Sequence, residues 1–248
     1  MKDPYFLLQK GDVMPLEKLA CSFSDYPVRI ASFEKLTDPS YEVDRTSAVP
    51  LGTVEYIAKF CERAQIELPS SLWYPDEVLP LFDRNVRVGQ FKDALPEEFV
   101  KPSEKVKAFP ASVKKDLSVE VNPSEKTLIQ DVVPFESEFR FYLQDTITKF
   151  NIVGWARYDD LSVTNPEPDF DLVERIADVY HEILGPSAYS IDIGWRPDLQ
   201  RYSLVEVNDA WALGYYQNQD KQSNPPTRQQ YADMLVSRWR QILFCNIV

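Results

Sequence analysis

The sequence predicts a protein of mixed α/β and α+β class, with a small α/β lobe followed by lobes rich in strands. Strand-like and helical patterns alternate over residues 5–68, which is typical of an α/β lobe. Short strand-like runs then occupy residues 85–158, and a β-hairpin lies between two amphipathic helices farther along the chain. With 248 residues, the chain can bury a core as one domain or as two or three lobes.

The composition excludes several classes of protein. The formal net charge of −12 and the pI of about 4.7 disfavour generic binding to nucleic acid or to an anionic membrane. No apolar run approaches the roughly 18 residues of a membrane span, and no secretory signal is visible. Three widely spaced cysteines predict reduced thiols, so we expect a cytoplasmic protein without disulfides or a zinc site. The single histidine excludes triads with a histidine base and multi-histidine metal sites.

Residues 1–84 are predicted to form the N-terminal α/β lobe. Strands are expected at 5–9 and 28–31, and helices near 16–20 and at 53–68. Thr53 is the expected N-cap of the longer helix, and a polar loop is expected at 37–45. Prolines at positions 69, 75 and 80 then break the chain into short pieces, with room for one short helix at 76–82.

Residues 85–155 are predicted to form a central lobe that carries two lysines. Its strands are expected at 85–91, 98–102, 127–133, 136–143 and 150–158. Lys101 closes an apolar run, and Lys107 follows six residues later. Two ammonium groups on adjacent β-elements can flank a polyphosphate. The alternative is that each lysine extends from a strand end into solvent.

The predicted strand at 136–143 carries three charged residues. Glu136, Glu138 and Arg140 alternate, so in a strand they share one face while Phe139 and Phe141 share the other. Arg140 offers a planar fork for a carboxylate or a phosphate. The alternative is a salt bridge on a solvated face.

Residues 156–248 are predicted to form a C-terminal lobe with two helices. The first is expected to begin at Asp169 or Asp171 and to end near 184, before Gly185-Pro186, and the second spans 227–244. Neither a G-x-x-x-x-G-K-[ST] loop nor a G-x-G-x-x-G turn occurs in the chain. Their absence argues against a P-loop protein or a classical dinucleotide-binding fold.

The hairpin between these helices carries candidate metal ligands. Asp192 lies in the first arm, and Glu206 and Asn208 share one face of the second. If Arg196 opposes Tyr202, then Asp192 lies across from Glu206, whereas a slip of one residue sends the two carboxylates to opposite faces. Two carboxylates and an amide oxygen are ligands that Mg²⁺ prefers. The alternative is a set of ordinary polar residues on a solvent face.

Four motifs, taken in order, resemble the ATP-grasp superfamily, and more closely its divergent clade marked by one arginine and two lysines. They are FVKP with Lys101, KAF with Lys107, the E-x-R-x-Y run with Glu138 and Arg140, and the D…VEVND arrangement of Asp192, Glu206 and Asn208. The match spans residues 85–216, and the N-terminal lobe takes the place of the substrate-side domain that usually precedes the fold. The resemblance implies an ATP-grasp fold, in which mostly antiparallel sheets sandwich the nucleotide.

The resemblance also implies roles for individual residues. ATP would be bound by Lys101, Lys107, Glu138 and the hinge run Gln130, Asp131, Val132 and Val133, which would read adenine through its backbone groups. Asp192, Glu206 and Asn208 would hold Mg²⁺. Arg140 and Lys107 would act in catalysis, with Arg140 facing the γ-phosphate or the substrate carboxylate. The chain has only 7 glycines and lacks the glycine-rich loop of many ATP-grasp enzymes, a departure that fits the divergent clade better.

The reaction implied by the resemblance joins a carboxylate to an amine through an acyl phosphate, with release of ADP and phosphate. The substrates would be small molecules or peptides. One alternative is a nucleotide-binding assembly factor that holds a protein partner without ligase turnover, for which exposed aromatic residues such as Trp211, Tyr215 and Tyr216 would offer a surface. Another alternative is phosphoryl transfer to a hydroxyl group.

Overall fold

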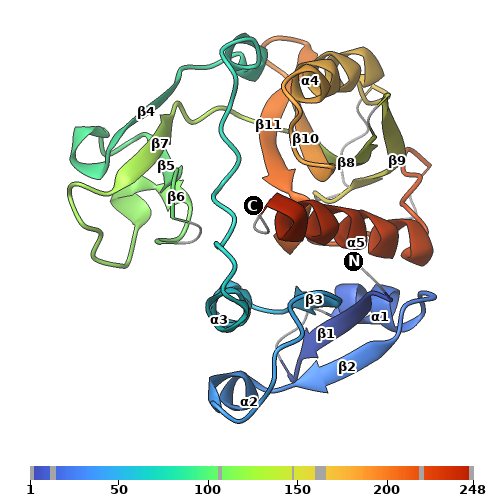
Figure 1. Ribbon diagram of the computed structural model, residues 1–248. Coiled ribbons are helices and arrows are strands. Elements are labelled where there is room, and N and C mark those ends of the chain that lie inside the picture. Colours follow the sequence, from blue (N-terminus) through green and yellow to red (C-terminus); the bar gives the residue numbers. More distant parts are fainter. Residues whose placement is uncertain are drawn as a thin grey trace.

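Three β-sheets organise the chain (Figure 1). The computed structural model describes residues 3–11, 15–105, 108–146, 148–159, 166–217 and 221–245. In Figure 1 the N-terminal sheet lies at the bottom, and the central and C-terminal sheets lie at the upper left and upper right. No helix in the described ranges combines the length and the hydrophobicity that a membrane span requires.

The N-terminal sheet is parallel and small. Its strands β1 (Tyr5–Gln9), β2 (Val28–Ala31) and β3 (Ala48–Leu51) lie in the order β2-β1-β3. Its helices are α1 (Pro15–Ser22), α2 (Phe33–Thr37) and α3 (Val54–Ala64). Thr53 caps α3 as predicted, because its hydroxyl accepts a hydrogen bond from the amide of Tyr56. The helix ends earlier than predicted, where Gln65 turns left-handed with a φ of 56°.

The central sheet is antiparallel and carries Lys101. Its strands β4 (Val86–Gln90), β5 (Phe99–Pro102), β6 (Ser112–Val113) and β7 (Lys126–Gln130) lie in the order β4-β7-β5-β6. Pairing in β7 ends at Gln130, three residues before the predicted end of that strand. A segment that includes the 3₁₀ helix η1 (Leu79–Phe82), within the short helix predicted at 76–82, leads from α3 to this sheet.

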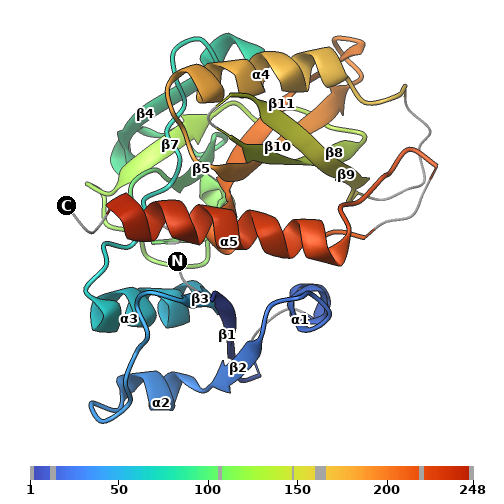
Figure 2. The same cartoon turned by 45° about the vertical axis from the view of Figure 1, so that its right-hand side comes forward.

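The C-terminal sheet is antiparallel and lies between two helices. Strands β8 (Glu138–Asp145), β9 (Phe150–Arg157), β10 (Ala188–Arg196) and β11 (Arg201–Asp209) lie in the order β11-β10-β8-β9. Figure 2 shows α4 (Phe170–Glu182) above this sheet and α5 (Arg228–Cys245) below it. Asp169 caps α4, because its carboxylate accepts a hydrogen bond from the amide of Leu172.

The predicted boundary between residues 155 and 156 falls inside β9. Both β8 and β9 pair within the C-terminal sheet, through the contacts of β8 with β10. We therefore propose that the central lobe ends in the connection between β7 and β8, at residues 131–137.

The two faces of the C-terminal sheet differ in chemistry. Under α4 the face is apolar, with Phe139 and Ile191 fully buried in one hydrophobic cluster. The opposite face is apolar where α5 packs on Tyr142, but farther along the same strands it carries Arg140 and Asp192. Because side chains alternate along a strand, this polar patch shares a face with the α5 contact. The patch lies at the side of the sheet that approaches the central lobe.

Candidate functional site

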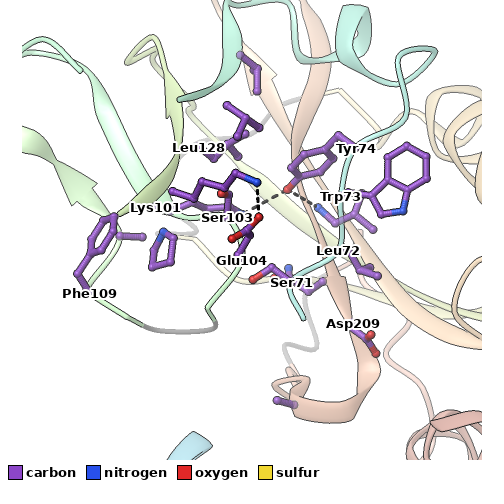
Figure 3. Close-up of a pocket in the computed structure, with 18 of the residues that line it drawn as sticks. Ser71, Leu72, Trp73, Tyr74, Lys101, Ser103, Glu104, Phe109, Leu128 and Asp209 are labelled. Atoms are coloured by element: carbon purple, nitrogen blue, oxygen red, sulfur yellow. Dashed lines mark hydrogen bonds and ion pairs between the residues drawn. The ribbon is translucent and has the colours of Figure 1, made fainter. Parts of the chain in front are cut away.

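A cavity of about 970 Å³ lies between the central sheet, β11 and the linker segment around residues 71–79. Lys101 and Leu128 line the side of the central sheet, and Tyr74 lines the side of the linker (Figure 3). Asn208 lines the cavity from β11. A concave, largely apolar cavity with a few convergent polar groups is typical of a site for a small organic ligand.

A β-bulge in β11 brings two predicted metal ligands together. The hairpin turn pairs Arg196 with Arg201, and not with Tyr202, the pairing that would by itself place the two carboxylates across from each other. A regular ladder from that turn would place Asp192 opposite Val205 and send Glu206 to the other face. Val205 is instead an extra residue, and Asp192 pairs with Glu206. The expected pairing is therefore present, but a bulge rather than the turn produces it.

A buried ion pair lies at the centre of the polar patch. The Nε and Nη2 atoms of Arg140 donate to the two carboxylate oxygens of Asp192 at 2.9 and 2.6 Å. The Asp192 side chain has no exposed surface. The Nδ2 atom of Asn208 donates to Asp192 at 3.3 Å and to Glu206 at 2.9 Å. Side chains from β8, β10 and β11 thus converge on one point.

Lys101 connects this cluster to the cavity. Its Nζ atom donates to Glu206 Oε2 at 3.1 Å and to the hydroxyl of Tyr74 at 3.3 Å. The Glu206 side chain is 32% exposed, whereas the Asp192 side chain is fully buried. Glu206 is therefore the more exposed carboxylate of this pair, and it lies directly behind the cavity wall, where its partners Lys101 and Asn208 are lining residues.

The electrostatics follow from these contacts. Burial acts to raise the pKa of Glu206, but the charges of Lys101 and Arg140 and hydrogen bonds from Asn208 and Lys101 lower it to about 2. Burial raises the pKa of Asp192 against the opposing charge of Arg140. For Lys101, burial acts to lower the pKa, but Tyr74 and Glu206 raise it above its usual value. At neutral pH, Lys101 and Glu206 therefore form a charged pair.

Two tyrosine rings lie against Arg140. Its guanidinium carbon is 5.0 Å from the ring centre of Tyr216 and 5.7 Å from that of Tyr158. The Tyr158 hydroxyl donates to Glu138 at 2.7 Å, and burial raises the pKa of Glu138 although this hydrogen bond acts to lower it. Cation–π contacts and the ion pair together fix the orientation of the guanidinium.

The structure separates the predicted adenine hinge from the cavity wall. None of the cavity-lining side chains in the described residues comes from 130–133. The Gln130 side chain accepts from Arg84 at 2.6 Å, and the Asp131 carboxylate accepts from Asn85 at 2.8 Å. Val132 is exposed. These side chains serve local structure, and only backbone groups of the run remain as candidates for adenine.

The remaining predicted residues have different outcomes. Lys107 lies outside the described residues. Glu136 lies outside β8, which begins at Glu138, two residues later than predicted. Glu138 lies at the edge of the polar patch and does not line the cavity.

Two aromatic residues expected on a partner surface are buried. Trp211 is 3% exposed and Tyr215 is 2% exposed, and the Tyr215 ring stacks on Tyr231 with centroids 4.5 Å apart. The expectation of an exposed aromatic surface there is wrong, because α5 covers this segment. Trp73 is 64% exposed and lines the cavity.

Sequence reasoning missed three residues of the site. Tyr74 contacts Lys101, Tyr158 contacts Arg140, and Arg84 contacts the backbone beside Glu206. Tyr74 and Arg84 precede the motif-bearing strands and belong to no recognisable motif. Tyr158 closes a predicted strand, but its position beside Glu138 depends on the pairing of β9 with β8, which the sequence pattern does not reveal.

Oxygen ligands for a divalent cation converge at the cavity end of the patch. No three His, Cys, Asp or Glu side chains form a metal-binding group within the described ranges, so the candidate set is Asp192, Glu206 and Asn208. Asn208 lines the cavity and donates from Nδ2 to both carboxylates, so its amide must turn for Oδ1 to face a cation beside them. With the amide turned, this hard-oxygen set fits Mg²⁺. Both Asp192 oxygens accept from Arg140, so Asp192 would share an oxygen between the guanidinium and a cation.

We expect the Lys101→Met variant to lose stability in a pH-dependent way. The pKa of Glu206 falls from 4.5 to about 2 on folding, so its pairing stabilises the fold above pH 4.5, and that contribution disappears as the pH falls toward 2. Urea unfolding at pH 7, 5, 4 and 3 should show a wild-type advantage over the variant that is largest at pH 7 and shrinks toward pH 3. An advantage independent of pH would contradict the charged pair.

Comparison with known proteins gives a family match over the part of the chain that contains the candidate site. The sequence model described as "ATP-grasp domain, R2K clade family 2" matches residues 81–224. That range contains the central sheet, the C-terminal sheet and the whole polar patch. No curated protein matches the chain.

Several solved structures resemble the chain at low identity. D-alanyl-alanine synthetase A from Vibrio cholerae has 11% identity and a TM-score of 0.50, with 98% of this chain and 99% of that chain covered. D-alanine–D-alanine ligase from Bacillus anthracis has 10% identity and a TM-score of 0.49, with 97% and 99% covered. A RimK domain ATP-grasp protein from Sphaerobacter thermophilus has 15% identity and a TM-score of 0.48, with 84% and 92% covered. At these identities, likeness concerns the fold alone.

Proposed function

This chain belongs to the R2K clade family 2 of ATP-grasp domains, and from that premise we propose that it is an ATP- and Mg²⁺-dependent ligase that joins a carboxylate to an amine. The family match confirms the predicted ATP-grasp fold. The substrates of the proposed ligase are small-molecule or peptide carboxylates and amines, which react through an acyl phosphate.

One observation carries the proposal: a cation in the cavity wall is paired with Glu206, the more exposed member of the carboxylate pair in the polar patch. Lys101 and Glu206 come from different sheets, and their charges meet at 3.1 Å beside a cavity of about 970 Å³. A nucleotide in this cavity would place its phosphates between an ammonium group and a hard-oxygen site. Such positioning and charge neutralisation are the main requirements of phosphoryl chemistry.

Each residue of the patch has a proposed task. Lys101 contacts Glu206 in the structure, and its ammonium group would contact both Glu206 and the phosphate oxygens when a nucleotide binds. Arg140, fixed by Asp192 and the two tyrosine rings, directs its charge at the γ-phosphate or the substrate carboxylate. Glu206, Asn208 and one oxygen of Asp192 would hold Mg²⁺, which would neutralise phosphate charge when bound.

The roles of the remaining predicted residues and of the N-terminal lobe are also proposals. We propose that the backbone of residues 130–133 binds adenine, that Lys107 contacts phosphate in catalysis, and that Glu138 supports the nucleotide site through Tyr158. Residues 1–84 are proposed as the lobe that selects the substrate. A cytoplasmic location stays a prediction from the sequence.

Two measurements on the wild-type protein test the ligase. Calorimetry with ATP should detect binding that strengthens when Mg²⁺ replaces EDTA. Incubation with pooled carboxylates, ATP and hydroxylamine should give a hydroxamate and ADP, because hydroxylamine captures an acyl phosphate. With an amine in place of hydroxylamine, mass spectrometry should find a product equal to acid plus amine minus water.

Other results would favour the alternatives. A phosphorylated product without an amide would indicate phosphoryl transfer to a hydroxyl. A stoichiometric protein partner that binds the ATP-loaded chain without ADP formation would indicate an assembly factor. Failure to bind ATP with or without Mg²⁺ would contradict all three functions.

A further inference from the structure

Arg84 lies between η1 and β4, and it contacts both large sheets. Its Nε and Nη2 atoms donate to the side-chain oxygen of Gln130 at 3.1 and 2.6 Å, and its Nη1 atom donates to the carbonyl of Phe82 at 3.4 Å. Two further hydrogen bonds cross to β11: Nη1 donates to the carbonyl of Leu204 at 2.9 Å and Nη2 to that of Val205 at 3.0 Å. The donor capacity of the guanidinium is therefore fully used.

The two β11 carbonyls belong to the bulge. In a regular strand, consecutive carbonyls point toward opposite edges of the sheet. Leu204 and Val205 instead direct both carbonyls to one guanidinium, at the step where Val205 is the extra residue. Because a bulge removes backbone groups from the ladder, those groups need another partner. Arg84 supplies it.

The surroundings of Arg84 are built to hold it in this place. Its guanidinium carbon lies 4.9 Å from the ring centre of Phe82 and 5.6 Å from that of Phe135. Phe135 occupies the space above Gly194, where a Cβ atom would lie 2.3 Å from its ring, so only glycine fits there. Burial lowers the pKa of Arg84 to about 10, which leaves it charged at neutral pH.

We propose that Arg84 is a positioning residue, which stabilises the bulge at Val205 and thereby turns Glu206 and Asn208 toward Asp192. Without the extra residue, a one-residue change of register would place Glu206 on the opposite face of β11. Arg84 acts on the backbone and does not touch the proposed ligands. Its effect on metal binding rests on the proposed function, whereas its effect on the bulge does not.

The hydrogen bonds from Arg84 to Gln130 also connect the central sheet to the C-terminal sheet. Gln130 closes β7 in the central sheet, and Lys101 lies in the neighbouring strand β5. Arg84 therefore links the sheet of Lys101 to the strand of Glu206, next to the pair that these two residues form. We expect the register of β11 and the spacing between Lys101 and Glu206 to depend on the same guanidinium.

The Arg84→Met variant tests the inference with two independent readouts. Hydrogen exchange should show faster exchange of the amides around Val205–Asn208 than in the wild type, because the bulge loses its partner. Electron paramagnetic resonance with Mn²⁺ and a non-hydrolysable ATP analogue should show metal affinity reduced about 10- to 100-fold, as for other outer-shell changes. Metal-free affinity for the analogue should change much less.

Arg196→Met is the matched control, because Arg196 is a buried arginine of the hairpin that, like Arg84, donates to a side chain and to a backbone carbonyl, but these belong to Asp198 and Asp83 rather than to the bulge. It should leave both readouts near wild type. Arg84→Lys should remain impaired, because one ammonium group cannot bridge Gln130 and both carbonyls.

The inference is overturned if Arg84→Met matches Arg196→Met in exchange, or if Arg84→Lys behaves as wild type. Equal losses of metal affinity and metal-free nucleotide affinity would also overturn it, because they would indicate a general loss of structure. If the wild type shows no metal-dependent binding of the nucleotide analogue, the proposed function fails. Hydrogen exchange around Val205 then decides the role of Arg84 by itself.

Discussion

The Arg140→Met variant is expected to lose about 3–5 kcal/mol of unfolding free energy at pH 7, the usual cost of removing one partner from a buried ion pair. Asp192 has no exposed surface, and both of its oxygens accept from Arg140. Its carboxylate would remain in the interior without a countercharge. Urea unfolding followed by tryptophan fluorescence measures the loss.

The pH dependence and a double variant separate charge from packing. In Arg140→Met the pKa of Asp192 should lie above its unfolded value, because burial already raises it in the presence of Arg140. The destabilisation should therefore be smaller near pH 4, where Asp192 can bind a proton, and grow as the pH rises. Arg140→Met combined with Asp192→Asn should recover most of the loss at pH 7. A double variant no more stable than the single one would contradict this account.

Much of the fold follows from local patterns. The strands at Tyr5–Gln9 and Val28–Ala31, the cap at Thr53 and the helix that begins after Asp169 agree with the prediction, because periodicity and capping are encoded within a few neighbouring residues. The short elements β3 and α2 carried too few residues to show a period. The lobe boundary at 155 was placed inside β9, because strand patterns do not reveal which strands pair.

The candidate site depends on contacts that a linear pattern does not encode. Asp192, Glu206 and Asn208 were identified by their oxygen chemistry, but their convergence depends on an extra residue at Val205 that has no turn signal. The partner of that bulge, Arg84, is about 120 residues away. Sequence could identify the ligand types, while the backbone contact that aligns them required the structure.

The second large effect is expected for Glu206→Gln, which removes the accessible negative charge while keeping the shape of the side chain. Glutamine keeps one acceptor oxygen for Lys101, and its Nε2 can donate to Asn208 Oδ1 once that amide turns, so we expect the free energy of unfolding to change by less than for Arg140→Met. The amide cannot supply a negative oxygen to a cation, and we expect ADP formation to fall about 10²- to 10³-fold, as for loss of other electrostatic contacts to a transition state.

Glu98→Gln is the control for this change, because Glu98 is also a mostly buried carboxylate with a cationic partner, Arg87 of the central sheet, and it accepts from Arg87 and the amide of Leu95, neither of which belongs to the polar patch. ADP formation and Mn²⁺ affinity should fall in Glu206→Gln and stay near wild type in Glu98→Gln. If Glu206→Gln kept wild-type Mn²⁺ affinity but lost ADP formation, Glu206 would act on the nucleotide or Lys101 and not on the metal. Full retention of both would remove Glu206 from the proposed site, because the more exposed carboxylate of the pair would then contribute neither to metal binding nor to turnover.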